Sequence, residues 1–165
     1  MRVFSIENDN IFKSYLNFKM KLIYDLGVST GLRISDIVAL KKDILKVKEP
    51  TIKEQKTGKS KRFYIKKDIK SRLLKIAEHS KNEYIFYSNS KLGHVTRQAV
   101  WKAFKKAYEK TGEKVNIGTQ SMRKKYARKL KEKHSFNYIK NKLNHESIMT
   151  SILYCANEKE IGKNE

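Results

Sequence analysis

Residues 118–154 constrain the fold more than any other stretch, because their apolar residues recur at helical spacing. After a small polar opening, Gly118-Thr119, the segment QSMRKKYARKL predicts a helix with Arg123 near its start. One side of this helix carries the apolar residues Met122, Tyr126, Ala127 and Leu130. Backbone N–H groups at a helix start attract anions, and a guanidinium there can add two parallel hydrogen bonds to a phosphate. The start of this helix is therefore a candidate phosphate site.

The second half of the stretch, KLNHESIMTSILY, predicts a turn at Asn144-His145 and then a last helix with Tyr154 near its end. The residues of this helix expected to face inward are Ile148, Ile152 and Leu153. Arg123, His145 and Tyr154 can then meet at one phosphate. Each also has an ordinary explanation when taken alone: a solvated basic helix, a helix-start histidine and a core aromatic.

The chain carries a large excess of positive charge. Its 38 Lys+Arg against 17 Asp+Glu give a formal net charge of +21, which indicates a polyanionic partner, first of all nucleic acid. A helix lying on a membrane would place its basic residues opposite one broad apolar face. Here the basic residues are spread along the whole chain, so an anionic membrane surface is the weaker alternative.

Cysteine and histidine usage argues against disulfide and metal chemistry. The single cysteine, Cys155, excludes an internal disulfide and a multi-cysteine zinc site. The four histidines have no ligand-like spacing, so we predict neither a metal nor another cofactor. The sequence has no signal peptide and no run of about 18 apolar residues, which predicts a cytoplasmic protein without a membrane partner.

The remaining segments predict a mainly helical α+β fold with one small antiparallel hairpin. Helices are expected over 10–27, after Gly31, over 68–80 and from Thr96 to Gly112, with an extended piece at 84–87. Residues 41–50 are expected to form a connector, and 51–55 and 62–65 two short strands joined by a lysine-rich tip. In the helix after Gly31, Arg33 and Asp36 lie among apolar residues. Arg33 therefore needs a ligand or a partner, and taken alone the two residues would form an ion pair.

Five elements in this order resemble the tyrosine recombinase family of the phage-integrase type. They are TGLRISDI (30–37), the hairpin tip EQKTGKSKRFYI (54–65), QSMR (120–123), LNH (143–145) and Tyr154. Together they cover nearly the whole chain. The resemblance implies the catalytic domain of a site-specific recombinase or integrase, which cleaves and rejoins DNA strands through a 3′-phosphotyrosine intermediate without a metal.

The resemblance also implies a role for each matching residue. The two phosphate-binding arginines fall on Arg33 and Arg123, the histidine-or-tryptophan position on His145, and the nucleophile on Tyr154. Asp36 falls at the acidic position that supports the first arginine. The hairpin lysine that protonates the leaving 5′ oxygen falls on Lys56, with Lys53, Lys59 and Lys61 as neighbouring alternatives and an exposed turn lysine as the ordinary explanation. The basic residues expected on a surface facing DNA are Lys59, Lys61, Arg62, Lys124, Lys125 and Arg128.

One position departs from the family's pattern. Three residues before the second arginine, where the family usually has histidine or lysine, the chain has Gln120. A glutamine amide can donate a hydrogen bond to a phosphate but cannot transfer a proton at neutral pH. General acid–base catalysis contributes roughly 10²–10⁴-fold, so we expect reduced activity. An inert surface amide is the alternative for Gln120.

We expect residues 1–165 to form one catalytic domain, without the N-terminal core-binding domain of SAM-like fold that full-length family members carry. The chain is then either a fragment or a one-domain relative. The expected partner is double-stranded DNA, on which further protomers join in a tetrameric synapse, and the expected setting is the nucleoid of a bacterium that carries the encoding mobile element or phage. Two other functions stay open: a catalytically weak DNA-binding module of the same fold, and DNA relaxation of the type IB topoisomerase kind.

Overall fold

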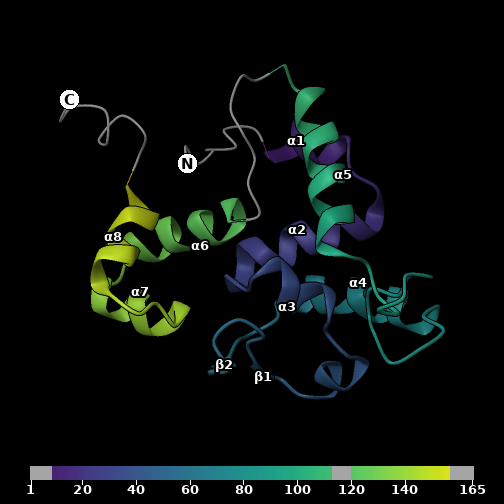
Figure 1. Cartoon of the computed structure of the whole chain (residues 1–165), viewed down its shortest axis with the longest axis horizontal. Helices are drawn as coiled ribbons and strands as arrows, with labels where there is room; N and C mark the ends of the chain where they lie inside the picture. The colour runs from purple at the N-terminus through teal and green to yellow at the C-terminus, as the bar shows by residue number, and fades with distance from the viewer. Residues whose placement is uncertain (1–8, 113–119, 157–165) are drawn as a thin grey trace.

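The computed structural model describes residues 9–112 and 120–156 of the 165-residue chain. The described helices are α1 (Asp9–Ser14), α2 (Phe18–Thr30), α3 (Ile34–Val38), a 3₁₀ helix η1 (Lys42–Lys46), α4 (Lys67–Glu78), α5 (Arg97–Glu109), α6 (Ser121–Lys131), α7 (Phe136–Leu143) and α8 (Ile148–Cys155) (Figure 1). Strands β1 (Thr51–Lys53) and β2 (Ser60–Arg62) pair antiparallel. The predicted mainly helical fold with a small hairpin is confirmed.

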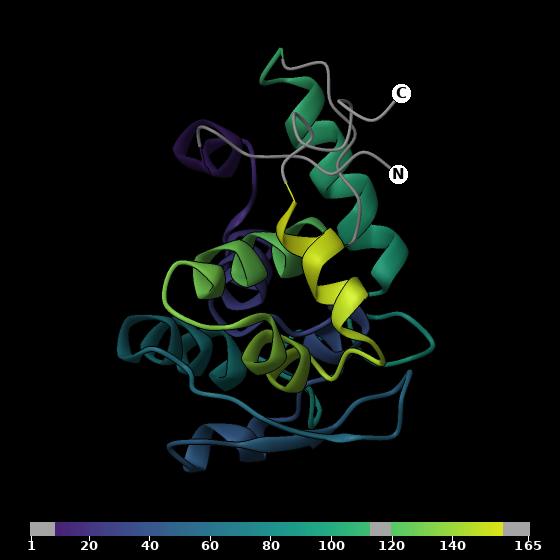
Figure 2. The same cartoon turned by 90° about the vertical axis from the view of Figure 1, so that its left-hand side faces the viewer.

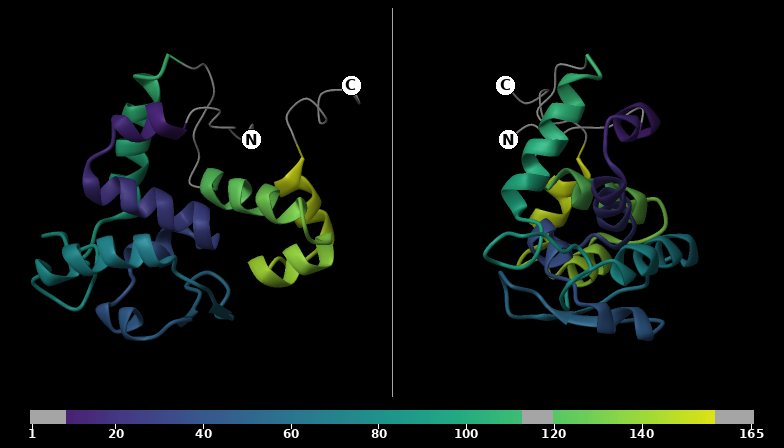
Figure 3. Two further views of the ribbon diagram at one scale, coloured as in Figure 1. Left: turned by 180° about the vertical axis from the view of Figure 1, so that it is seen from behind. Right: turned by 90° about the vertical axis from the view of Figure 1, so that its right-hand side faces the viewer.

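Two apolar clusters form the interior, and the buried residues of α2 belong to the larger one. The larger cluster gathers buried residues of α1 to α5 with Met122 of α6, and the smaller one joins α6, α7 and α8 through Ala127, Ile139, Leu143 and Cys155. Figure 1 shows α6–α8 together on one side, and Figure 2 turns that side toward the viewer. In Figure 3 the hairpin lies at the bottom of the molecule, below α4. Within the described ranges no helix has the length and apolar character needed to cross a membrane.

The prediction of one helix over residues 10–27 is wrong, because the helix is interrupted between α1 and α2. Asn17 begins α2, and its side chain accepts a hydrogen bond from the N–H of Met20 at 2.9 Å. The helix then continues through Gly27 to Thr30. A Cβ at Gly27 would lie 2.4 Å from the sulfur of Met122, so glycine at this position allows α2 and α6 to pack closely.

Gly31 ends α2 in a left-handed conformation. Its φ is 65° and its N–H donates to the carbonyl oxygen of Gly27 at 2.9 Å, the usual way in which a glycine terminates a helix. A Cβ at Gly31 would lie 2.3 Å from Cδ1 of Tyr126. Both the backbone angle and the contact therefore require glycine in the TGLR segment, and the turn places Arg33 directly before α3.

The hairpin is shorter than predicted, and its second strand begins earlier. Thr51 pairs with Arg62, Ile52 with Lys61 and Lys53 with Ser60. Residues 63–65 lie outside β2, and the expected connector at 41–50 contains η1. The predicted helices at α4 and α5 and the extended piece at 84–87, which is held by isolated bridges, are confirmed within a few residues.

Helix α7 was not predicted from the sequence. Ser135 caps its start by accepting a hydrogen bond from the N–H of Tyr138 at 3.3 Å, and Ile139 and Leu143 are buried. Asn144, with φ 53°, ends it, so the predicted turn at 144–145 is confirmed. The predicted opening of α6 at Gly118-Thr119 lies outside the described residues.

Helix α8 exists as predicted, but its inward face is different. Ile148, Ile152 and Leu153 are 41%, 36% and 53% exposed, whereas Ser151 and Cys155 are buried. The inward face of α8 is not its most apolar face. Ser151 faces His145, and Cys155 packs with the buried apolar residues of α6 and α7.

Candidate active site at the junction of α2, α6 and α8

Arg123 of α6 is enclosed at the centre of the site, with 1% of its surface exposed. Its Nη1 donates to the carbonyl oxygen of Gly31 at 2.7 Å and its Nη2 to that of Leu143 at 2.6 Å. One guanidinium thus joins the end of α2 to the end of α7. Burial and the charge of Arg33 lower the pKa of Arg123 from its ordinary value. An arginine keeps its charge in proteins, so this buried cation requires an anion nearby.

That anion is Glu54, a residue that the sequence analysis missed. Its Oε1 lies 2.6 Å from Nη1 of Arg33 and 3.8 Å from Nη1 of Arg123. Its Oε2 accepts hydrogen bonds from Thr57 Oγ1 at 2.8 Å and Asn144 Nδ2 at 3.1 Å. Burial would raise the pKa of this carboxyl, but the contacts with Arg33, Thr57 and Asn144 outweigh it and lower the pKa below its ordinary value. Glu54 therefore stays ionised and holds both arginines.

Asp36 does not form the ion pair with Arg33 that the two residues would form alone. It is buried, and its Oδ1 accepts a hydrogen bond from the backbone N–H of Gln55 at 3.0 Å. Burial raises the pKa of Asp36, which makes it the poorer counter-charge of the two buried acids. Asp36 instead links α3 to the start of the hairpin turn by its hydrogen bond with Gln55, which follows Glu54, the residue that pairs with Arg33.

Two lysines of the hairpin have opposite surroundings. Lys56 is exposed in the turn, whereas Lys61 is 3% exposed, with its Nζ 3.0 Å from the carbonyl oxygen of Gly31. Burial and then the charge of Arg123 lower the pKa of Lys61 to about 7. The prediction that Lys61 lies on a surface is contradicted, because the pairing of β1 with β2 points its side chain inward beside the arginines.

The rings of His145 and Tyr154 meet at an angle of 63° with their centroids 4.5 Å apart. Nδ1 of His145 lies 2.8 Å from Oγ of Ser151, and its buried Nε2 has no hydrogen-bond partner among the described residues. Burial and then the charges of Arg123 and Arg33 lower the pKa of His145 to about 4, so the ring is neutral at neutral pH. Tyr154 also lies beside the Arg123 guanidinium. The fold thus brings together the three residues that the sequence pattern singled out.

Gln120 directly precedes α6 and contacts the tyrosine. The Tyr154 hydroxyl donates a hydrogen bond to Oε1 of Gln120 at 3.0 Å, and Nζ of Lys124 lies 5.7 Å from the centre of the tyrosine ring. The side chain of Gln120 is therefore part of the site and not an isolated surface amide. We call seven residues of this site the arginine–tyrosine cluster: Arg33, Glu54, Lys61, Gln120, Arg123, His145 and Tyr154.

The other basic residues expected to face DNA differ in their exposure. Lys59 and Arg62 are exposed on the hairpin. Lys125 forms an ion pair with Asp9, and Nη2 of Arg128 donates to the backbone carbonyl that follows α8 at 2.9 Å. Lys125 and Arg128 are therefore already engaged in holding α1 and the end of α8 against α6.

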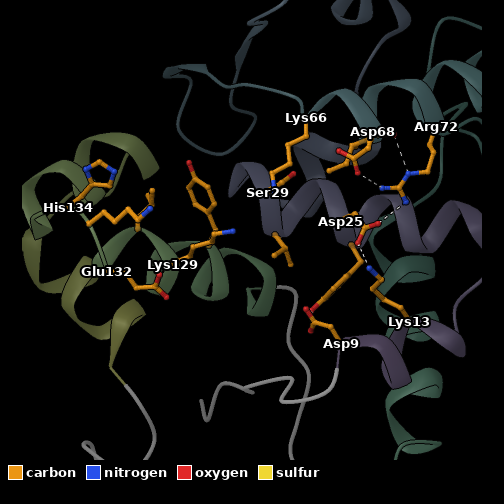
Figure 4. A pocket seen from close by; sticks show the side chains of 16 residues that line it. Asp9, Lys13, Asp25, Ser29, Lys66, Asp68, Arg72, Lys129, Glu132 and His134 are labelled. Atoms are coloured by element: carbon orange, nitrogen blue, oxygen red, sulfur yellow. Dashed lines mark hydrogen bonds and ion pairs between the residues drawn. The ribbon is translucent and has the colours of Figure 1, made fainter.

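A separate groove of about 470 Å³ lies between α2, α4 and α6 (Figure 4). In it Asp25 accepts hydrogen bonds from Lys13 and Arg72 at 2.9 Å each, and Arg72 also reaches Asp68 at 3.2 Å. None of the arginine–tyrosine cluster lines this groove. Because these acidic groups are already paired with basic ones, we place the candidate active site at the cluster. Across the described ranges, no three His, Cys, Asp or Glu side chains are grouped so as to hold a metal ion.

Comparison with known proteins finds similarity in family and in fold. A family model described as the phage integrase family matches residues 6–160. None of the curated proteins compared with the chain matches it. Similar solved structures are those of XerA recombinase (TM-score 0.77, 17% identity), of XerH site-specific recombinase bound to palindromic difH substrate in a post-cleavage complex (0.77, 20%), and of a lambda integrase dimer bound to a COC′ core site (0.74, 20%).

The alignments cover 98%, 96% and 99% of this chain but only 61%, 50% and 49% of the XerA, XerH and lambda integrase chains, respectively. This chain therefore spans less than two thirds of each of them. At these identities the likeness shows a shared fold.

Proposed function

The chain belongs to the phage integrase family, and on this premise we propose that it is the catalytic domain of a tyrosine recombinase that cuts and rejoins duplex DNA through Tyr154. The observation that carries the proposal is that the Tyr154 hydroxyl lies beside the buried guanidinium of Arg123 while the Tyr154 ring packs against the neutral ring of His145. A tyrosine that served only to fill the core would not need a buried guanidinium beside its hydroxyl.

The cluster suits a phosphodiester. Negative charge grows on the phosphate oxygens during attack, and preorganised guanidiniums and hydrogen-bond donors stabilise that charge. Arg33 and Arg123 are held in place by Glu54, and the unpartnered Nε2 of His145 can donate a further hydrogen bond when it carries the proton. In the free protein, the carboxylate of Glu54 is the anion that faces both arginines.

The proposed reaction exchanges one phosphodiester for another. The Tyr154 oxygen attacks the phosphorus and its proton passes to water, the bond from phosphorus to the 5′ oxygen breaks, and the leaving 5′ oxygen takes a proton from a lysine. The product is a 3′-phosphotyrosine and a free 5′ hydroxyl, and attack by a 5′ hydroxyl reverses the step. We assign the proton donor to Lys56, which lies in the exposed turn and can approach bound DNA. Lys61 is the alternative donor, because its pKa is about 7.

The proposed partners are double-stranded DNA and further protomers assembled on it. Their support is the net charge of +21 and the likeness to XerH bound to difH and to a lambda integrase dimer bound to a core site. The proposed setting is the cytoplasm of a bacterium, at the nucleoid, where a protein encoded by a mobile element or phage would meet its DNA. Lys59, exposed near the hairpin turn that carries Lys56, is well placed to contact the DNA backbone, and Arg62, exposed at the other end of the hairpin, forms an ion pair with Glu49 in the free protein.

The test uses duplexes nicked close to the cleavage position, so that the short cleaved end diffuses away and the covalent product accumulates. A panel of duplexes from the flanks of the encoding element is incubated with the wild type and with Tyr154→Phe, and denaturing gels are run. We expect a protein–DNA band with the wild type alone. Salt-sensitive binding of the same duplexes without any covalent band would instead support a DNA-binding module.

A further inference from the structure

Ser151 occupies an enclosed position that the proposed mechanism has not used. It is completely buried, lies in α8 less than one turn before Tyr154, and has its Oγ 2.8 Å from Nδ1 of His145. Polar side chains in the interior are usually there because they are hydrogen-bonded. The partner of this hydroxyl is the histidine ring that contacts the tyrosine.

The other ring nitrogen of His145 has the opposite situation. Its Nε2 is buried without a hydrogen-bond partner in the described part of the chain, although the nearby charges of Arg123, Arg33 and Lys61 would attract an anion to this region. A neutral imidazole carries its hydrogen on one nitrogen only, and the hydrogen bond made by the other nitrogen decides which one. If Nδ1 accepts from Ser151, Nε2 carries the hydrogen and can donate it to a phosphate oxygen.

We propose that Ser151 is a positioning residue that sets the tautomer of His145, so that Nε2 donates a hydrogen bond to the phosphate under attack. The inference rests on the proposed function, because it concerns the same phosphate. A hydroxyl suits the task because it carries a hydrogen that it can donate to Nδ1 of the neutral ring.

The placement of Ser151 in α8 has a consequence for the order of events. Ser151 and Tyr154 belong to the same helix, so the group that orients His145 moves with the nucleophile. When α8 is seated, Tyr154 lies at the phosphate and Nε2–H is available to it. When α8 is displaced, the site loses the Tyr154 hydroxyl and the oriented Nε2–H together. The hydrogen bond from Nε2 to the phosphate therefore forms only when the nucleophile is present.

The first test measures single-turnover cleavage of the nicked duplex by Ser151→Ala. We expect a rate about 10-fold below the wild type, the loss typical of one oriented hydrogen bond to a group that meets a charge. Ser135→Ala is the matched control, since it deletes the same atom from the cap of α7, away from the histidine. Ser151→Cys, which keeps the volume but donates weakly, should also be slow, and thermal melting verifies that each variant folds.

A double-mutant cycle separates positioning from packing. In a His145→Gln background there is no tautomer to set, so Ser151→Ala should cause little further loss. If Ser151→Ala slows both backgrounds by the same factor, Ser151 acts through packing alone and the inference is refuted.

Nitrogen NMR of the protein without DNA gives a second readout that cleavage does not affect, and no phosphate is then present to hold the hydrogen on Nε2. We expect His145 to carry its hydrogen on Nε2 when Ser151 is present, and to populate both tautomers in Ser151→Ala. An unchanged tautomer in the free Ser151→Ala protein would also overturn the inference. Failure of the wild type to form any covalent product would refute the proposed function, and the tautomer in the free protein would still decide the role of Ser151.

Discussion

Replacing Glu54 with glutamine removes the anion between the two arginines while leaving the side-chain volume almost unchanged. Glu54 is 1% exposed, and its carboxylate faces Arg33 at 2.6 Å and Arg123 at 3.8 Å. After Glu54→Gln, these two cations and the buried Lys61 share the site without a matching negative charge other than Asp36, whose pKa burial raises. The perturbation is therefore electrostatic.

Removing one partner of a buried ion pair typically costs about 3–5 kcal/mol, because the remaining charge stays buried without compensation. Arg33 retains some contact with solvent, its side chain being 14% exposed, so the lower end of that range applies. For a chain of this size a loss of about 3 kcal/mol corresponds to a decrease in the melting temperature of roughly 9 °C.

The assay is thermal and urea unfolding of the free protein at neutral pH and moderate salt. Glu83→Gln is the matched control, because it makes the same substitution in an exposed pair, Lys41–Glu83, at 3.0 Å. We expect this control to melt with the wild type, since exposed pairs are screened by water and salt. A melting temperature of Glu54→Gln equal to that of the control would refute the view that Glu54 holds the arginines.

Three further predictions concern the proton donor, the pH dependence of stability and the glycine turn. Lys56→Ala should slow cleavage by about 10²-fold. Its cleavage rate should recover on a duplex with sulfur in place of the 5′ bridging oxygen, because a thiolate leaves without a proton. If the rate recovers for Lys61→Met and not for Lys56→Ala, Lys61 is the proton donor. Because burial lowers the pKa of His145 to about 4, the unfolded chain takes up that proton first as the pH falls from 6.5 toward 4, and the unfolding free energy should decrease by up to about 3 kcal/mol. His145→Gln should lack this part of the decrease in urea titrations, and an identical pH profile would contradict the burial of a neutral ring. Gly31→Ala should lower the free energy of unfolding by about 3 kcal/mol, because its φ is 65° and the added Cβ would lie 2.3 Å from the Tyr126 ring. Gly58→Ala, with φ 66° and no atom closer than 3.9 Å to the added Cβ, should lower it by only about 1–2 kcal/mol. Equal losses in the two variants would exclude a contribution from the clash.

The sequence was most informative where residue type and spacing carry the chemistry. Arg123, His145 and Tyr154 could be placed at one site because each lies at a recognisable helix end or turn, and the structure brings them within contact of one another. Gly31 was identified only as a break between helices. Its second purpose, to offer a carbonyl oxygen to both Arg123 and Lys61, depends on side chains distant in sequence.

The residues that were missed or misplaced are those whose position depends on packing. Glu54 is one acidic residue among the lysines of a hairpin, and only its proximity to two distant arginines gives it importance. The charge of Lys61 predicts a surface position, but the alternation of side chains along β2 directs Lys61 inward. In α8 the apolar residues predicted the wrong face, because the helix is oriented by the contact of Ser151 with His145 and by Cys155 in the α6–α7 cluster.

The most direct test of the central claim is to identify the residue that becomes attached to DNA. The covalent product is digested with nuclease and protease, and the peptide that carries the residual nucleotide is sequenced by mass spectrometry. The mechanism predicts a nucleotide attached through its 3′ phosphate to Tyr154, with a free 5′ hydroxyl on the released strand. A nucleotide on any other residue, or a 5′-phosphate link, would contradict the assignment of Tyr154 as the nucleophile.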